Sequence, residues 1–403
     1  MQFDFNFYSS LLLLTFSNGL FYSFLLLKKA IKNESQPDYW LSIFVLLCSL
    51  FVAPWMLGFA GWYDNQPYRN FMFYTPFQQL FFIGPIIYFY TQSLLNPAFK
   101  FTRQQIIHLV PPILYLLYIF IMFVYDGLIS KTPYFYADGM DKDFDLWHQI
   151  AGQISMILYF ILSLKYYQVY RRLIVQISSN ADALLFIWIK KYLIAFLIMI
   201  VSPLFFKVIN IFFPQENGYQ DSWWFYLFYS LVLFYIAVTG YSNAVEAKIG
   251  YNFNFEDHNM QYSIVDQQNI STAEKTTFNL DFENENEAIS PEIIAMTTRI
   301  ESLIQTEKLY QNPELSLTEI AKKLESNTSI ISKAINQGFG MNFNDFINNY
   351  RIEAVKKMFD DGAHKKSTLI GIAYDCGFNS KATFNRAFKK NTTFTPKEYL
   401  AKI

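Results

Sequence analysis

The first 241 residues carry seven long hydrophobic runs that are separated by short polar segments. Each run is close to 20 residues, the length that an α-helix needs to cross the ~30 Å hydrocarbon core of a bilayer. The core helices of a soluble all-α protein seldom keep this length so many times over, so the pattern predicts seven transmembrane helices. The expected spans are Phe7–Leu27, Trp40–Gly61, Phe77–Leu95, Ile106–Tyr125, Gln149–Tyr167, Tyr192–Phe213 and Trp223–Tyr241.

Basic residues are distributed unevenly among the segments between these runs. If the N-terminus lies outside, the inner segments hold ten Lys and Arg residues and the outer segments hold three. Basic residues accumulate on the cytoplasmic side of membrane proteins, so the count predicts an outside N-terminus and a cytoplasmic C-terminus. The inner residues are Lys28, Lys29, Lys32, Lys100, Arg103, Lys165, Arg171, Arg172, Lys190 and Lys191; the outer residues are Arg69, Lys131 and Lys142.

Composition divides the chain into three parts. The apolar residues, 53% of the whole chain, are concentrated before residue 242. Residues 251–290 hold eight acidic residues and one lysine, whereas residues 291–403 hold 16 Lys and Arg against 12 Asp and Glu. A polar, acidic segment without sustained periodicity is typical of a flexible linker. We therefore expect a transmembrane domain at 1–241, an acidic flexible linker at 242–290 and a basic domain at 291–403.

The basic domain contains one sequence pattern twice, first offset by 52 residues and then by 53. Each copy predicts a short helix with a bulky–small residue pair, a turn, and a second amphipathic helix, which is a helix–turn–helix unit. The fold class is therefore all-α. The first copy is Leu317-x-x-Ile320-Ala321-x-x-Leu324 with Asn327, Ile331 and Ile335; the second is Leu369-x-x-Ile372-Ala373-x-x-Cys376-Gly377 with Asn379, Phe384 and Phe388.

Turn and cap residues refine the two copies. Asn327 and Asn379 are expected to be N-caps whose side-chain oxygens accept free N–H groups of the following helix. Gly377 suits a turn with positive φ, but Glu325 stands at the matching position of the first copy. Thr393 likewise stands where Gly340 ends the first copy. Both departures predict a small local loss of stability.

The second helix of each copy has a polar face that carries basic and hydrogen-bonding residues but no acid. Such a face suits a helix that lies in the major groove of DNA, although an ordinary solvated face is the alternative. The candidate base-contacting residues are Ser329, Ser332 and Lys333 in the first copy and Lys381, Ala382, Asn385 and Arg386 in the second. The candidate phosphate-contacting residues are Lys322, Lys356, Lys389, Lys390 and Lys397.

These motifs resemble the C-terminal DNA-binding domain of the AraC/XylS family of bacterial transcription regulators. The resemblance covers residues 290–403 and implies two helix–turn–helix units joined by a long helix at about Phe343–Phe359. It also implies that two recognition helices enter successive major grooves of double-stranded DNA. The matching motifs are Gly340-Met341-Asn342-Phe343-x-x-Phe346-Ile347-x-x-Tyr350-Arg351-Ile352, Ile372-Ala373-x-x-Cys376-Gly377-Phe378-Asn379-Ser380 and Thr395-Pro396-x-x-Tyr399.

The sequence predicts no catalytic, metal or cofactor site. Two cysteines, Cys48 and Cys376, have no metal-ligand spacing, and no nucleotide-binding glycine loop or nucleophile elbow is present. Lys207 inside the sixth run is more simply explained as a snorkelling lysine than as a ligand counter-ion or a Schiff-base lysine. His108 and His148 lie near run ends and are expected at the membrane interface.

Further segments leave alternatives open. The outer segment Asp126–Leu146 is rich in aspartate, which favours a solvated acidic loop over a cation site. An apolar stripe, Ile293, Met296, Ile300 and Leu303, packs on the basic domain or pairs two chains in a homodimer.

The sequence as a whole predicts a multi-pass protein of the inner (cytoplasmic) membrane whose cytoplasmic domain binds DNA and regulates transcription. Its partners would be DNA, the lipid bilayer and an unknown signal ligand or membrane partner. The rival interpretation is a membrane transporter or enzyme with a regulatory helix–turn–helix domain. A third is an adaptor whose helix–turn–helix units bind protein.

Overall fold

The computed structural model describes residues 5–130, 133–181, 187–212, 218–242, 250–253, 261–265, 277–279 and 290–402. The chain divides into two units. The first contains Met1–Tyr167 and Ile187–Glu246, and the second contains Gln168–Phe186 and Ala247–Ile403. Helix α7, Leu146–Ile177, therefore contributes residues to both units.

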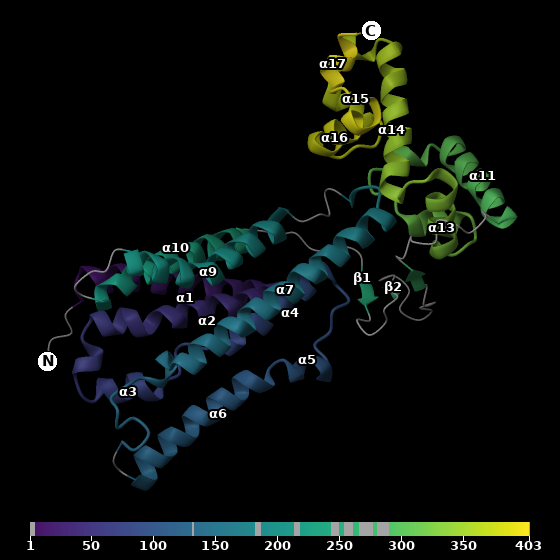
Figure 1. Cartoon of the computed structure of the whole chain (residues 1–403). Helices are drawn as coiled ribbons and strands as arrows, with labels where there is room; N and C mark the ends of the chain where they lie inside the picture. Colours follow the sequence, from purple (N-terminus) through teal and green to yellow (C-terminus); the bar gives the residue numbers. More distant parts are fainter. Residues whose placement is uncertain are drawn as a thin grey trace. The chain divides into compact units, whose positions relative to one another are not determined.

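The first unit is a bundle of long apolar helices (Figure 1). Successive segments run back and forth, with α3 at the same end of the bundle as the N-terminus and α5 at the other end. Its helices are α1 Phe7–Asn33, α2 Gln36–Phe59, α3 Tyr68–Tyr74, α4 Leu80–Leu95, α5 Arg103–Ile107, α6 Val110–Val124, α7 to Tyr167, α9 Ile187–Phe212 and α10 Gly218–Ser242.

Six of the described helical segments are long and apolar enough to cross a membrane, whereas the sequence predicts seven. The difference is α4, which has only 16 residues because the chain at residues 75–79 is not helical. Pro76 lies within this stretch, and the backbone N–H of Gln78 donates to Asp143 Oδ2 at 2.8 Å instead of to a helical carbonyl. Nearly all of α4 is buried, so the third predicted run, Phe77–Leu95, forms an interior helix of the bundle.

Small residues let the helices of the bundle approach closely, as is common between membrane helices. A Cβ atom added to Gly19 of α1 would lie 2.1 Å from Ser49 Oγ of α2, so a larger residue would require the Ser49 side chain or the helices to shift. Ser42 Oγ donates to Ser23 O at 2.8 Å between the same pair. The first two helices are therefore held by close packing and by a buried hydrogen bond.

The aspartate-rich segment between α6 and α7 differs from the solvated loop that the sequence favours. Asp126, Asp141 and Asp143 are all buried, and Asp143 is only 2% exposed. Tyrosine hydroxyls and backbone N–H groups replace water around them: Tyr63 donates to Asp141 and Tyr115 to Asp143, each at 2.6 Å. Burial, together with the nearby charge of Asp143, raises the pKa of Asp141 to about 7.

Of the two histidines named above, one is buried inside the structure and the other, His108, is partly exposed. His148 is fully buried, stacks on Tyr115 at 4.1 Å between ring centroids, and its Nδ1 lies 2.9 Å from Asp143 O. His148 therefore packs within the protein rather than at a solvated interface. His108 Nδ1 lies 2.9 Å from the Tyr159 hydroxyl. Within the described residues, no group of three or more His, Cys, Asp or Glu side chains could hold a metal ion.

Part of the expected linker forms regular structure. Three short strands, β1 Gly250–Phe253, β2 Gln261–Val265 and β3 Thr277–Asn279, pair as an antiparallel sheet in the order β1-β2-β3. The alternation of aromatic and branched residues in Tyr251-x-Phe253 and Tyr262-x-Ile264 favours strands. The acidic flexible linker at 242–290 stays a prediction, because apart from these strands residues 243–289 lie outside the described residues.

The second unit contains the expected helices of the basic domain, and Figure 1 shows α14 running between a group formed by α11–α13 and a group formed by α15–α17. The long helix predicted at Phe343–Phe359 is confirmed as α14, Phe343–Asp360. The other helices are α11 Pro291–Thr306, α12 Leu317–Lys323, α13 Thr328–Phe339, α15 Leu369–Asp375, α16 Lys381–Thr392 and α17 Pro396–Leu400.

Helix α11 packs on α13. Its residues Ile293, Ile300 and Ile304 are buried, and a Cβ atom added to Gly338 of α13 would lie 2.1 Å from the Thr297 methyl carbon. The apolar stripe of this helix is thus used inside the domain, as one of the two sequence interpretations expected.

Candidate nucleic-acid interface

The first helix–turn–helix unit is formed by α12 and α13. Ser316 caps α12 by accepting the Glu319 N–H at 3.3 Å, and Asn327 caps α13 by accepting the Ile330 N–H at 2.8 Å. The predicted cap at Asn327 is thus confirmed. Glu325, in the turn, has a φ of 50°, so the expected departure from glycine does place a side chain in the left-handed region.

The second unit is formed by α15 and α16. Gly377 in its turn has a φ of 93°, and an added Cβ atom would lie 2.3 Å from the Tyr310 carbonyl oxygen. Glycine is therefore required both for the backbone conformation and for space. The N-cap of α16 is Ser380, which accepts the Thr383 N–H at 3.1 Å, so the prediction of Asn379 as the cap is wrong.

The N-cap of α16 is one residue later than predicted because the extra residue of the second copy lies before α16 and not within it. Ser380 is 53 residues after Asn327, the same offset that separates the buried Ile331 and Phe384. Both recognition helices consequently begin at the same point relative to their buried residues. Their C-termini also match, with Gly340 at a φ of 66° and Thr393 at a φ of 65°.

Helix α14 connects the two units through buried side chains. Ile352, Val355 and Phe359 of α14 share one hydrophobic core with Ile372 and Phe384 of the second unit. Phe343, Phe346 and Ile347, near the start of α14, are buried beside the first unit. Because α14 is packed along much of its length, it fixes the spacing of α13 and α16.

The structure places six of the seven candidate base-contacting residues at or near the surface. Lys333 of α13 and Lys381, Ala382, Asn385 and Arg386 of α16 are exposed, and Ser329 is partly exposed. Ser332 is the exception, since it is only 8% exposed. The second recognition helix therefore presents a longer and more open polar face than the first.

The candidate phosphate-contacting lysines fall into two groups. Lys322, Lys389 and Lys397 are exposed. Lys390 forms an ion pair with Asp345 at 2.7 Å, and Lys356 pairs with Glu353 at 2.7 Å and also donates to Asn391 Oδ1 at 3.0 Å. The pairs are open to solvent on at least one side, so a DNA phosphate could replace the carboxylate at small cost.

Ser332 is buried because the end of α7 lies beside it. Asn336, one turn further along α13, donates to Ser332 Oγ at 3.2 Å and to Gln176 Oε1 at 3.3 Å. Gln176 belongs to the last turn of α7. The contact therefore occupies part of the face of α13 that the sequence assigns to DNA.

The chain just after α7 is fixed more strongly, through Arg351. This side chain is 1% exposed, and its guanidinium donates to Ser179 O at 3.1 Å and to Ser179 Oγ at 3.0 Å. It also donates to Tyr310 O and Asn312 O, each at 2.8 Å. Burial lowers the pKa of Arg351 to about 10, so the group stays charged at neutral pH and its carbonyl partners offset the lost water.

Backbone contacts complete this attachment. The Ser179 N–H donates to Leu315 O at 3.1 Å, and Ser178 forms an antiparallel bridge with Ser316. Asn344 Nδ2 donates to Ser178 O at 3.3 Å and to Ser179 O at 3.0 Å. Residues 176–179, which we call the α7 tail, are thus bound to α12, α13 and α14 together.

The second recognition helix, α16, also interacts electrostatically with α7, through Arg386 and Arg171. Burial and, to a lesser extent, the positive charge of Arg171 lower the pKa of Arg386. The two guanidinium groups, one from α7 and one from α16, therefore interact electrostatically.

Sequence reasoning missed Arg351, Asn344 and the α7 tail as functional elements. Arg351 was visible as part of a family motif, but its partner Ser179 is 172 residues away and belongs to no recognisable pattern. The inner-loop residues Arg171 and Arg172 indicated only membrane orientation. A buried arginine that binds carbonyl oxygens leaves no periodic signal in either segment.

Taken together, residues 316–393 contain two capped helix–turn–helix units held at a fixed spacing by one long helix. The C-terminal region is thus a helix–turn–helix domain of the AraC type.

Comparison with known proteins agrees with this assignment. Residues 320–402 match the family model described as "Helix-turn-helix domain". Two relatives, from Staphylococcus aureus strains COL and MSSA476, are described as uncharacterized HTH-type transcriptional regulators. Each is 36% identical over 92 residues, which is 23% of this chain and 12% of the relative. The chain thus spans only a small part of these curated relatives, and no solved structure gives a significant match.

Proposed function

We propose that the protein is a membrane-integral transcription regulator that binds a specific DNA sequence through α13 and α16. The single observation that carries the proposal is the pair of matched recognition helices on the two sides of α14, which fixes their spacing. The helix–turn–helix match and the descriptions of the relatives support a regulator rather than an enzyme.

In this proposal, α16 supplies most of the base recognition. Arg386 would donate to guanine O6 and N7, and Asn385 would read a neighbouring base. Lys333 and Ser329 would serve the same role from α13, with Lys381 and Ala382 lining the groove. Lys322, Lys356, Lys389, Lys390 and Lys397 would neutralise phosphates and set the affinity for DNA of any sequence.

The surface of the apolar helix bundle, Met1–Tyr167 and Ile187–Glu246, supports membrane integration. Large apolar side chains are exposed along its helices; Phe120 is 60% and Phe205 58% exposed. A soluble protein rarely exposes apolar surface on this scale. With α4 counted as a crossing enclosed by other helices, the chain would cross seven times. The distribution of basic residues then supports an outside N-terminus and a cytoplasmic location for residues 291–403.

The membrane unit would supply the signal, either a ligand or a membrane partner. The observation that favours coupling is that α7 belongs to both units, because a helix transmits a displacement along its length. A membrane transporter with a regulatory domain would share this architecture. It differs from the present proposal in that a chain without residues 291–403 would keep its activity.

The test is selection of binding sites from a random pool of duplex DNA by the full chain in lipid nanodiscs. The expected result is a two-part motif whose halves are about one helical turn apart. Arg386→Ala should relax one half, Lys333→Ala should relax the other, and each should weaken binding by about 1–3 kcal/mol at most.

Lys365→Ala provides a matched control, because this exposed lysine lies between α14 and α15 and on neither recognition helix. It should change neither half of the motif. Failure to enrich any sequence, with weak binding at all salt concentrations, would contradict direct DNA recognition and favour the adaptor.

A further inference from the structure

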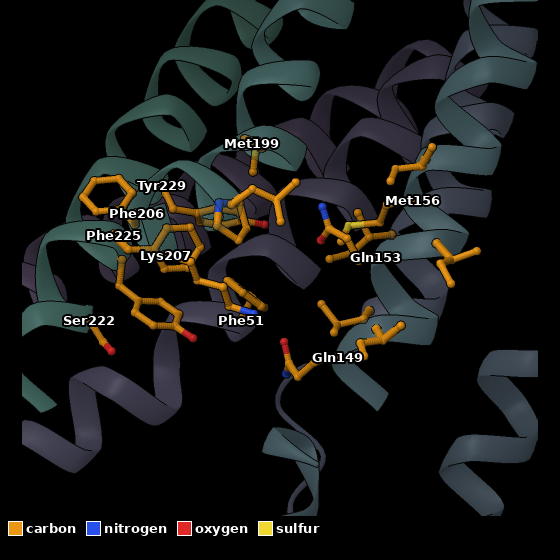
Figure 2. A pocket seen from close by; sticks show the side chains of 18 of the residues that line it. Phe51, Gln149, Gln153, Met156, Met199, Phe206, Lys207, Ser222, Phe225 and Tyr229 are labelled. Carbon is orange, nitrogen blue, oxygen red and sulfur yellow. The ribbon is translucent and has the colours of Figure 1, made fainter. Parts of the chain in front are cut away.

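A cavity of about 490 Å³ lies within the apolar helix bundle, among α2, α4, α7, α9 and α10. Figure 2 shows Lys207 with Phe206, Phe225 and Tyr229 on one side of it, and Gln149 and Gln153 on the other. This size lies within the range of about 300–1,000 Å³ that is usual for small-molecule sites. Most of its lining is aliphatic or aromatic.

Lys207 is the single formally charged residue among the described side chains that line this cavity. No Asp or Glu accompanies it there. A cation inside a membrane-spanning helix is costly unless an anion or water reaches it, and such residues often mark a functional site. The two glutamines use their amide N–H groups elsewhere: Gln149 donates to Gln78 Oε1 at 2.7 Å and Gln153 to Ile200 O at 2.5 Å.

The cavity lies toward one end of the bundle. Lys207 is close to the end of α9, Gln149 close to the start of α7, and Ser222 close to the start of α10. These helix ends lie at the end of the bundle that holds the N-terminus (Figure 1), which is the outer end in the proposed orientation.

We propose that this cavity binds an amphiphile with an anionic head group, which pairs with Lys207, and an apolar tail, which lies against the aromatic lining. Charge complementarity selects the head, and the apolar lining selects the tail. The ligand could reach it as a free carboxylate or as an anionic phospholipid, since both present the same chemistry. This proposal rests on the membrane integration proposed above.

The test uses the full chain in nanodiscs of neutral phosphatidylcholine, with tritiated palmitate as the probe and methyl palmitate as its uncharged analogue. Palmitate should bind at least tenfold more tightly than the ester. Lys207→Met should remove that preference, and Lys207→Arg should keep it. Lys191→Met, which removes an exposed lysine of the same helix outside the cavity, should leave it unchanged.

Phosphatidylglycerol added to the nanodisc distinguishes the two sources. Competition with palmitate identifies an anionic lipid as an occupant, and no competition identifies a free amphiphile. Equal retention of palmitate and ester by the wild type and by Lys207→Met would overturn the proposal. Met156→Trp, which fills the cavity without removing the charge, should abolish binding of both probes; retained binding would also overturn it. A chain that does not enter nanodiscs at all would instead contradict membrane integration.

A second and independent observation concerns the α7 tail. Gln176 contacts Asn336 on the polar face of α13, and Ser332 beside it is buried. In this arrangement Ser332 is too buried to contact a base edge, and Gln176 occupies the amide group of Asn336. The tail is held by the hydrogen bonds of Arg351 and Asn344.

We infer that the α7 tail and DNA compete for the first recognition helix, so that the docked tail is an autoinhibitory element. This inference rests on the proposed DNA recognition. The tail contacts a recognition helix through Gln176 and is anchored elsewhere through Ser178 and Ser179. Release and locking of the tail can therefore be produced by different substitutions.

Release is tested with Gln176→Ala combined with Ser179→Pro, which removes the N–H that donates to Leu315 O. The affinity of the full chain in nanodiscs for its selected DNA, measured by fluorescence anisotropy, should rise at least tenfold. Lys165→Ala, an exposed residue further back on α7, should leave it unchanged.

Locking is tested with Gln176→Cys and Asn336→Cys in one chain. Oxidation should lower DNA affinity at least tenfold and reduction should restore it, whereas neither single variant should respond. An unchanged affinity after release or a lower one, as expected if Arg171 assists DNA binding, would overturn the inference. Absence of DNA binding by the wild type, the released and the reduced chains alike would instead contradict the proposed function.

Discussion

The two helix–turn–helix units share one backbone plan but divide the work unequally. In the second unit, a glycine occupies the strained turn and α16 presents a lysine, an asparagine and an arginine to solvent. In the first unit, Glu325 occupies the strained turn, α13 offers mostly short side chains, and the α7 tail covers part of them. Two units with the same backbone arrangement can therefore serve different roles. In the proposed function, the second unit supplies most of the base recognition and the first regulates DNA binding.

The largest effect that would test this comparison is on folding of the second unit. Gly377→Ala should destabilise the DNA-binding unit by about 2–4 kcal/mol, because the new Cβ would meet the Tyr310 carbonyl at a φ of 93°. Glu325→Ala, at the matching position, should have almost no effect, since a Cβ is already present there. Pulse proteolysis of the full chain in urea measures both. Similar losses of unfolding free energy for the two variants would contradict the proposed difference between the two turns.

The next effect is on base recognition. Arg386→Ala should weaken specific binding about 10- to 100-fold, and Lys333→Ala should weaken it less, because α13 is partly covered. Anisotropy titrations with matched and mismatched DNA separate loss of specificity from loss of overall affinity. Equal losses would mean that the first unit reads bases as strongly as the second.

A smaller effect concerns the positive-φ residues that are not glycine. Glu325→Gly and Thr393→Gly should each stabilise the unit by about 0.5–1 kcal/mol, because glycine adopts a φ near 50–65° without steric cost. Urea midpoints from the same proteolysis assay provide the measurement. Gly340→Ala, which introduces the same strain at the matching helix end, serves as the reverse control and should destabilise by a similar amount.

The smallest expected effect is one that the two units share. Lys322→Gln in the first unit and Lys389→Gln in the second should each reduce the slope of log affinity against log salt by about one, because each removes one phosphate contact. Titrations at several salt concentrations measure the slope. Unequal changes would extend the asymmetry of the units from base contacts to the DNA backbone.

Local features of the fold could be predicted from the sequence, because they depend on neighbours in the chain. The cap at Asn327, the turn at Gly377, the strain at Glu325 and the long helix α14 all follow from such short-range rules. The resemblance to the AraC/XylS domain placed the same elements. The shift of the second cap to Ser380 was missed because an extra residue can enter a loop at several points.

Features that depend on distant residues could not be predicted in the same way. The aspartates Asp141 and Asp143 looked solvated because the tyrosines that bind them come from other segments. The shortening of α4 depends on hydrogen bonds of Gln78 with residues far along the chain. The burial of Ser332 depends on Gln176, 156 residues earlier, so no periodic pattern on α13 reveals it.

The α7 tail has a quantitative consequence, because it is part of the same chain as the surface it covers. The fraction of molecules with a docked tail does not depend on protein concentration. The apparent DNA affinity is the intrinsic affinity multiplied by the fraction of time that the tail is undocked. A tail docked nine-tenths of the time would weaken binding about tenfold, which corresponds to only about 1.4 kcal/mol. In the proposed regulator, a signal of that modest size would suffice to change DNA affinity by an order of magnitude.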